Sequence, residues 1–420
     1  MNPILKNDAF IPDVEARKFA DGYLYLYGSK DTPENDIYCS RHYDVFRSKD
    51  MIHWEQFKNV FSSQCAHRNH NGLLYAPDCE YINGQYCLFY CMDDGTEGVA
   101  FSKNPYGPFR NARPIGGADG TGIDPAIFVD DDGKVYYFWG QIKAKGAELD
   151  TEKWCIKQET LNTCIINDKE HGFHEGSSLR KRNGIYYYVY ADISRGRPTC
   201  LGYATSNSPL GLYTKQGIII DNTGCDPSSW NNHGSIAEYN GQWYVFYHRA
   251  TNNSFYSRRT CIEPIKFDEN GKIQEVGMTT QGSEAPISSH TILSGGNACC
   301  LKGKLFIRQY SDVYRSYEYL TNLHNGDSFA YKYLHFNGKE SKVRLTASVL
   351  QDPYTITLYV DRTEKQSVLA CIHVTGKAGN FNFNGFSAKL ENTIYGKHAL
   401  TIKIDGPSGT LGNFLSLQFV

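Results

Sequence analysis

Five short aromatic runs recur along the first two thirds of the chain, and each begins with Asp-Gly or Asn-Gly. They are DGYLYLY (21–27), NGQYCLFY (83–90), DGKVYYFW (132–139), NGIYYYVY (183–190) and NGQWYVFY (240–247). These dipeptides are strong hairpin-turn signals, and the aromatic residues that follow favour strands. The apolar positions show no 3.6-residue period, so helices are not expected here. Each run is therefore predicted to be the second strand of a β-hairpin.

The spacing of these hairpins indicates a repeat architecture. Their turn glycines are separated by 49 to 62 residues. A period of about 50 residues accommodates four short strands, which is the content of one β-propeller blade. Five copies predict five blades around a central channel, with the first strand of each blade lining it. Residues that precede different hairpins are therefore expected to meet near one axis.

The pattern changes after about residue 285. The segment APISSHTILSGGNACC (285–300) reads as a connector, and alternating segments such as YTITLYVD (354–361) and FLSLQFV (414–420) follow it. Regularly spaced alternating strands predict an antiparallel β-sandwich, and about 120 residues can bury a core of their own. The expected protein is all-β, with a five-bladed β-propeller at residues 1–287 followed by a β-sandwich at residues 300–420.

Composition narrows the classes of function and location. Lys and Arg total 43 and Asp and Glu total 45, so the net charge of −2 gives no indication of a nucleic acid or anionic membrane partner. The N-terminal MNPILKNDAF has no basic and apolar signal regions, and no stretch approaches the roughly 18 apolar residues of a membrane span. The 13 cysteines lack paired C-x-x-C spacing. They are interpreted as reduced thiols, which predicts a cytoplasmic protein.

Acidic residues stand at one offset before three of the hairpins. Asp13, Asp124 and Glu175 each lie nine residues before the turn glycine, while His233 lies eight and Asp78 six residues before theirs. An unpaired acid in a strand interior costs several kcal/mol of desolvation. A single acid of this kind is readily explained as a solvated residue or a turn cap. Three acids at the same offset in three blades indicate a shared axial site instead.

Carboxyl groups that face one pocket are suited to glycoside hydrolysis. One must be protonated to donate to the leaving oxygen, and one must be ionised to activate water or attack carbon. A third negative charge nearby raises the pKa of the acid. Sequence spacing by itself leaves the assignment of these roles open.

Several segments, taken together, resemble glycoside hydrolase family 43 over about residues 8–285. They are IPDVEARKFADGYLYLYGSKD, YAPDCEYINGQYCLFY, GVAFSKNPYGPF, GIDPAIFVDDDGKVYYFWG, HEGSSLRKRNGIYYYVYA and NHGSIAEYNGQWYVFYHR. The resemblance implies a five-bladed propeller that hydrolyses arabinose- and xylose-containing glycans with inversion. It also implies that Asp13 is the general base, Asp124 the orienting residue and pKa modulator, and Glu175 the general acid.

The chain departs from this family pattern at two places. It reads Glu-Gly-Ser at Glu175 where members often read Glu-Gly-Pro, and it has Tyr75 where a tryptophan is common. Tyr75 is still expected to bind substrate, because stacking on a sugar requires only an aromatic face. The resemblance assigns Arg258 to substrate binding as well, and its planar donor fork suits paired hydroxyls. A surface ion pair is the alternative for Arg258.

Rival residues exist for two of the catalytic roles. Glu15 rivals Asp13 as the base, because alternation along a strand places both on the same face. Asp119 rivals Asp124, although it precedes a Gly-Thr-Gly turn.

His233 has three interpretations. The resemblance implies a position below the pocket, where it contacts substrate or lies beside a structural Ca²⁺ or a water cluster. Calcium prefers oxygen ligands, so one histidine is a weak indicator of a metal site. A buried histidine with satisfied hydrogen bonds is the remaining alternative.

The leading hypothesis is an inverting, exo-acting enzyme that releases terminal α-L-arabinofuranosyl units from arabinoxylan-derived or other xylo-oligosaccharides. Its chemistry requires no cofactor, with a Ca²⁺ at the axis as a structural option. A β-D-xylosidase and a non-catalytic glycan-binding propeller are the alternatives. A purely structural propeller would fill its channel with apolar side chains. The second domain resembles a carbohydrate-binding module of family 6, yet it contains no tryptophan, and a buttressing role is the alternative for it.

Overall fold

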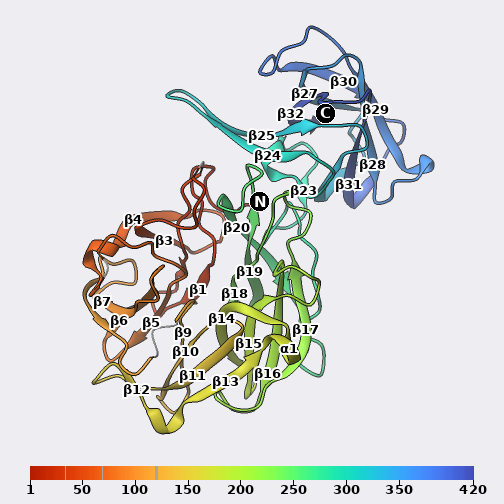
Figure 1. The fold of residues 1–420 in the computed structure, drawn as a ribbon. Helices are drawn as coiled ribbons and strands as arrows, with labels where there is room; N and C mark the ends of the chain where they lie inside the picture. The colour runs from red at the N-terminus through yellow and green to blue at the C-terminus, as the bar shows by residue number, and fades with distance from the viewer. Residues whose placement is uncertain (34, 69, 119–121) are drawn as a thin grey trace.

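The computed structural model describes residues 1–33, 35–68, 70–118 and 122–420. Five sheets, one for each sequence repeat, form a ring, and two further sheets stack beyond it (Figure 1). This arrangement confirms the all-β prediction of a five-bladed propeller followed by a β-sandwich.

The five blades contain three to five strands each. The first consists of β1 (Glu15–Lys18), β2 (Leu24–Tyr27), β3 (His42–Ser48) and β4 (Glu55–Ser62). The second consists of β5 (Asp78–Ile82), β6 (Gln85–Cys91), β7 (Glu97–Ser102) and β8 (Arg110–Pro114). The third consists of β9 (Ala126–Val129), β10 (Val135–Trp139), β11 (Lys143–Asp150), β12 (Cys155–Ile156) and β13 (Asn162–Asn167). The fourth consists of β14 (Phe173–Arg182), β15 (Ile185–Asp192), β16 (Cys200–Ser206) and β17 (Thr214–Asp221), and the fifth of β18 (Ser235–Tyr239), β19 (Gln242–Ala250) and β20 (Arg258–Ile265).

Helical segments in the described residues are short. They are α1 (Asp168–His171), η1 (Ser63–Cys65), η2 (Gln158–Thr160), η3 (Gly295–Asn297) and η4 (Lys365–Ser367). None of these described helices has the length and apolar character that a membrane span requires.

The Asn-Gly turns form as the sequence predicts. In the second, fourth and fifth blades the first two strands are joined by two-residue loops, Asn83-Gly84, Asn183-Gly184 and Asn240-Gly241. Both residues of each loop have positive φ, which asparagine tolerates and glycine adopts freely. The Asp-Gly hairpins of the first and third blades have longer loops, with Lys18 facing Leu24 and Val129 facing Val135.

The aromatic strands supply apolar clusters between neighbouring blades. Tyr25 and Tyr27 of the first blade pack in one cluster with Leu88 and Tyr90 of the second. Comparable clusters join the other blades around the ring. Because each blade buries both faces against its neighbours, the ring holds the innermost strands β1, β5, β9, β14 and β18 at fixed positions.

The N-terminal segment closes the ring at the fifth blade, whose sheet has three strands. The backbone N–H of Ile4 donates to the carbonyl of Thr260 in β20 at 3.0 Å. The Ser235 hydroxyl of β18 donates to the Val14 carbonyl at 2.9 Å and accepts from the Ala16 N–H at 3.0 Å. The first and last elements of the propeller are thereby joined next to the axis.

Buried charges, rather than apolar side chains, connect the innermost strands. Arg17 of β1 donates to Asp78 at 2.9 Å and to Glu80 at 3.0 Å, both in β5. Arg180 of β14 donates to Glu15 of β1 at 2.6 Å. A purely structural propeller is expected to fill its channel with apolar side chains, whereas these innermost strands carry paired charges.

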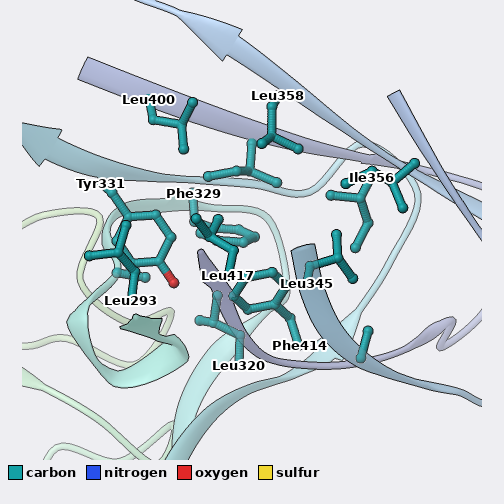
Figure 2. Packing of buried hydrophobic residues seen from close by; sticks show 14 of the residues in the cluster. Leu293, Leu320, Phe329, Tyr331, Leu345, Ile356, Leu358, Leu400, Phe414 and Leu417 are labelled. Carbon is teal, nitrogen blue, oxygen red and sulfur yellow. The ribbon is translucent and has the colours of Figure 1, made fainter. Parts of the chain in front are cut away.

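The C-terminal domain packs two six-stranded sheets face to face around an apolar core, part of which Figure 2 shows. One sheet contains β21 (Ile287–Ser288), β23 (Cys299–Lys302), β26 (Ser328–Asn337), β28 (Tyr354–Val360), β29 (Val368–Val374) and β31 (Tyr395–Asp405). The other contains β22 (Leu293–Ser294), β24 (Phe306–Ser311), β25 (Ser316–Leu323), β27 (Lys342–Val349), β30 (Asn384–Lys389) and β32 (Gly412–Phe419). Strands β21 and β22 lie in the expected connector, so the sandwich extends back to about residue 287. The resemblance to a family 6 binding module stays a prediction.

The axial ion pairs predict the stability of the propeller. Replacing Arg17 by Met leaves Asp78, which is fully buried, without its cation, so the free energy of unfolding should fall by about 3–5 kcal/mol. Tryptophan fluorescence during urea unfolding reports this, because all five tryptophans belong to the propeller. As a control, Lys153→Met breaks the exposed Lys153–Asp150 pair and should cost less than about 0.5 kcal/mol. A similar small loss in both variants would contradict a structural role for the Arg17 pair.

Candidate active site

A cavity of about 260 Å³ lies where the innermost strands begin. All six residues to which the sequence assigns a site role line it: Asp13, Tyr75, Asp124, Glu175, His233 and Arg258. Ring closure is what brings these distant segments together. The structure thus groups the predicted residues, while their individual roles in substrate binding and catalysis stay predictions.

The backbone at the carboxylates is unusual. Asp13 and Asp124 each lie two residues before an innermost strand, and their φ angles are 57° and 54°. A non-glycine residue in this left-handed region costs about 1 kcal/mol or more and is frequent at functional sites. Glu175 lies within β14, where the pairing with β15 is irregular and the following Gly176 has a φ of 78°. The backbone therefore departs from regular strand geometry at or next to each of the three acids, where the chain borders the cavity.

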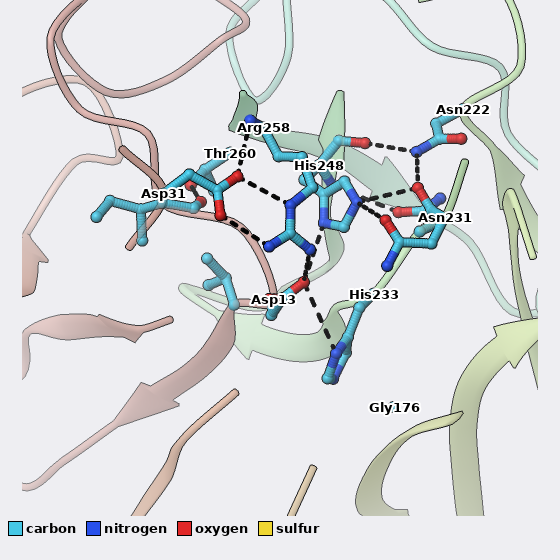
Figure 3. A network of polar contacts seen from close by, with 12 residues as sticks. Asp13, Asp31, Gly176, Asn222, Asn231, His233, His248, Arg258 and Thr260 are labelled. Atoms are coloured by element: carbon cyan, nitrogen blue, oxygen red, sulfur yellow. Dashed lines mark hydrogen bonds and ion pairs between the residues drawn. The ribbon is translucent and has the colours of Figure 1, made fainter. Parts of the chain in front are cut away.

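Asp13 is surrounded by cationic and polar nitrogen groups (Figure 3). Arg258 Nη1 donates to Asp13 Oδ1 at 2.9 Å, and the Nδ1 atoms of His248 and His233 lie 3.4 and 3.8 Å from the same oxygen. Burial alone would raise the pKa of Asp13, but the charge of Arg258 and the two histidines outweigh burial and lower it below the ordinary value. Asp13 is therefore ionised at neutral pH, as a general base must be.

Arg258 is a buried residue that bridges two carboxylates. Besides its bond to Asp13, its Nε and Nη2 donate to the two oxygens of Asp31, each at 2.9 Å. Its side chain is 3% exposed, so the alternative of a surface ion pair is wrong. The guanidinium instead fixes the orientation of Asp13. Contact between Arg258 and a sugar stays a prediction.

Asp124 lies between the other two acids and the backbone of β14. The Gly176 N–H donates to Asp124 Oδ2 at 3.1 Å, which ties Asp124 to the residue that follows Glu175. Burial and the negative charges of Glu175 and Asp13 raise the pKa of Asp124 well above its usual range. Asp124 therefore holds its proton up to a higher pH than an exposed aspartic acid does.

Glu175 is more accessible to solvent than Asp124. Its side chain is 13% exposed, compared with 6% for Asp124. Gln141 Nε2 donates to Glu175 Oε2 at 2.7 Å, and His174 Nε2 lies 3.8 Å from the same oxygen. The carboxyl group is thus oriented by a neutral amide and opens toward the space that a substrate would occupy.

The two rival acids are placed elsewhere or not described. Glu15 does not line the cavity; its carboxylate accepts a hydrogen bond from Arg180 and lies 4.0 Å from Arg17. Alternation along β1 does put it beside the axis, but two arginines pair with it there. Asp119 lies outside the residues that the structure describes.

A known protein family matches the propeller. The model of the family described as "Glycosyl hydrolases family 43" matches residues 1–273, well over half of the chain. The chain belongs to glycosyl hydrolases family 43. The match covers the propeller and stops before the sandwich.

Individual family 43 proteins resemble the chain over different lengths. A xylosidase/arabinosidase from Thermoclostridium stercorarium is 31% identical over 326 residues, 67% of each chain. A β-xylosidase/α-arabinofuranosidase from a compost metagenome, solved with xylotriose in a calcium-free form, is 26% identical with a TM-score of 0.58 over 66% of this chain and 97% of that one. An arabinoxylan arabinofuranohydrolase from Bacillus subtilis covers 100% of this chain and 97% of its own, with a TM-score of 0.56 and 22% identity, and supports the two-domain fold.

His233 lies between Asp13 and Asp124. Its Nδ1 is 3.8 Å from Asp13 Oδ1 and 3.7 Å from Asp124 Oδ2, and burial lowers its pKa. A calcium ion needs six to eight oxygen ligands. Among the described residues, no group of three or more His, Cys, Asp or Glu side chains could hold a metal ion. The protein side chains at His233 therefore do not form a calcium site by themselves, and a role for His233 as a metal ligand stays a prediction.

Several cavity residues were missed from the sequence. Tyr38, Gln141, His174, Trp230 and Asn231 line the cavity, and His248 lies behind Asp13. Two of these could have been found: the second strand of a hairpin returns to the end where the first began, so residues after the aromatic runs reach the same rim. His248 follows such a run directly, and Gln141 lies two residues beyond another. His174 lies in β14 directly before Glu175, and Tyr38, Trp230 and Asn231 lie on loops with no comparable signal.

The surroundings of Asp124 predict the pH dependence of hydrolysis. Burial and the charges of Glu175 and Asp13 keep a proton on Asp124 up to a higher pH than an exposed carboxyl would allow. In Asp124→Asn this titrating group is gone, so the alkaline limb of the pH–kcat/KM profile should move down by roughly one pH unit, with a lower kcat.

Asp226→Asn is the matched control for this prediction. Burial raises the pKa of Asp226 to about 7, but Asp226 does not line the catalytic cavity. The Asp226→Asn substitution should therefore leave the alkaline limb of the pH–kcat/KM profile unchanged. An unmoved limb in Asp124→Asn would show that Asp124 does not set the protonation of the site.

Proposed function

We propose that this family 43 glycoside hydrolase is an inverting, exo-acting enzyme that releases terminal α-L-arabinofuranosyl units from arabinoxylan-derived oligosaccharides. The observation that carries the proposal is the convergence of three carboxyl groups with unequal surroundings on one cavity. Arg258 pairs with Asp13 and lowers its pKa, while burial and like charges raise the pKa of Asp124. Glycoside hydrolysis requires one ionised and one protonated carboxyl group.

The proposed reaction is a single displacement. Asp13 takes a proton from a water molecule as that water attacks the anomeric carbon. Glu175 gives a proton to the glycosidic oxygen as its bond to the same carbon breaks, so the sugar leaves with inverted configuration. The negative charge of Asp124 favours the protonated form of the acid, and Asp124 also holds the backbone beside Glu175 by accepting a hydrogen bond from the Gly176 N–H.

The size of the cavity supports removal of single terminal units. Its volume of about 260 Å³ lies below the range of about 300–1,000 Å³ that is usual for ligand pockets. Tyr75 and Tyr38 supply aromatic faces at its wall. A cavity of this size favours one small sugar over an internal stretch of polysaccharide, and the names of the relatives include an arabinosidase and an arabinofuranohydrolase.

A β-D-xylosidase is the second candidate. The related proteins include xylosidases, one of them solved with xylotriose. Arabinofuranose and xylopyranose carry the same number of hydroxyl groups on rings of different size, so the fit of the ring decides between them.

A substrate panel tests the function and its stereochemistry. We expect 4-nitrophenyl α-L-arabinofuranoside and arabinoxylan oligosaccharides to be cleaved faster than 4-nitrophenyl β-D-xylopyranoside. NMR spectra taken in the first minutes should show the product anomer opposite to that of the substrate. Retention would contradict the single displacement, faster xyloside cleavage would favour the second candidate, and binding without turnover would indicate a non-catalytic propeller.

Replacing Glu175 separates proton donation from the other steps. In Glu175→Ala, kcat for arabinoxylan oligosaccharides should fall by about 10²–10⁴-fold, because their leaving groups need a proton. An aryl glycoside with an acidic phenol needs little protonation, so its kcat should fall much less. Glu152→Ala removes an exposed carboxyl of a turn and should change neither rate. Equal losses on both substrates in Glu175→Ala would rule out Glu175 as the acid.

A further inference from the structure

A second cavity, of about 400 Å³, lies where the propeller meets the β24–β25 hairpin of the sandwich. Both domains contribute to its wall, through Ser228, Asn252, Phe255, Tyr256, Arg308 and Gln309 among others. Figure 1 shows this hairpin projecting from the sandwich above the propeller.

Two pairs of aromatic rings connect this cavity with the catalytic one. Tyr38 lines the catalytic cavity and Tyr256 the second one, and their ring centroids are 4.6 Å apart. Trp230 lines the catalytic cavity and Phe255 the second one, and their ring centroids are 6.3 Å apart. The cavities are therefore neighbours, and a chain of sugars could extend from one into the other.

The hairpin is attached firmly to the propeller at this point. The Asn252 N–H donates to the Ile307 carbonyl at 2.7 Å, and the Gln309 N–H donates to Asn252 Oδ1 at 3.1 Å. On the adjacent strand, Glu318 forms a buried ion pair with Arg259 of β20. These contacts hold Arg308 and Gln309 in a constant position relative to the cavity.

The groups around the second cavity suit a neutral saccharide. Amides of asparagine and glutamine, serine hydroxyls, the Arg308 guanidinium and the Asp36 carboxylate supply donors and acceptors for sugar hydroxyls, and the one cation and one anion leave no excess of charge among these groups. Phe255 and Trp230 are 37% and 41% exposed, so each presents part of an aromatic face on which a sugar ring can stack.

We propose that the second cavity binds the xylose units of the main chain to which the released sugar is attached. This inference rests on the proposed function, in which the catalytic cavity holds the terminal sugar. The leaving part of the substrate then lies across the aromatic pairs toward Arg308 and Gln309. The sandwich is in that case part of the substrate-binding surface of the enzyme.

The prediction is a selective loss of oligosaccharide binding. In Arg308→Ala and in Phe255→Ala, KM for an arabinosylated xylotetraose should rise roughly fivefold to tenfold, as expected when a few hydrogen bonds or a stacking contact are lost. The kcat/KM for 4-nitrophenyl α-L-arabinofuranoside should stay within about twofold of the unmodified protein, because its leaving group does not reach the second cavity.

Arg315→Ala is the matched control. Arg315 lies near the turn of the same hairpin, is 73% exposed and does not line the cavity, so its removal should change neither substrate. Unchanged oligosaccharide KM in both test variants, or equal losses on both substrates, would overturn the inference. If the unmodified protein cleaves neither substrate, the proposed function fails and the inference fails with it; activity of the unmodified protein with unaltered test variants overturns the inference alone.

Discussion

The contact between the N-terminal segment and β20 is the constraint on which the site depends. Thr260 of β20 holds this segment through bonds to Ile4 and Ile11, and two residues further Asp13 meets Arg258 of the same strand. The partners are about 245 residues apart, and bringing such distant segments together costs chain entropy. The apolar clusters between the blades offset that cost. The contact between the N-terminal segment and β20 therefore both closes the ring and places Arg258 beside Asp13, the proposed base.

The charges near the axis are arranged in two levels. Away from the cavity, Arg17 and Arg180 pair with Glu15, Asp78 and Glu80 of the innermost strands, so each of these three acids has a cation. In the cavity, Arg258 pairs with Asp13 and Asp31, whereas the ion pairs of Asp124 and Glu175 among the described residues are with His233 and His174. This imbalance lowers the pKa of Asp13 and raises the pKa of Asp124 in one cavity. Fully compensated acids would all ionise and could not donate a proton.

The contacts between the two domains fix the position of the sandwich relative to the propeller. Its hairpin is joined to the propeller by Asn252 and by the ion pair of Arg259 with Glu318. Breaking that pair would leave a buried charge uncompensated, which is costly, so the junction favours one arrangement of the two domains. A fixed arrangement is needed if residues of both domains are to contact one substrate.

The sequence by itself determined the repeat, the number of blades, the presence of a sandwich and the identity of three acids at one offset. These follow from local rules, since turn chemistry and alternation act over a few residues. Tertiary structure alone decided that Glu15 pairs with Arg180 and that Arg258 is buried against Asp13. It also decided that Trp230 and Arg308 border neighbouring cavities. These outcomes depend on which distant charges and loops meet when the ring closes, and no local pattern encodes that.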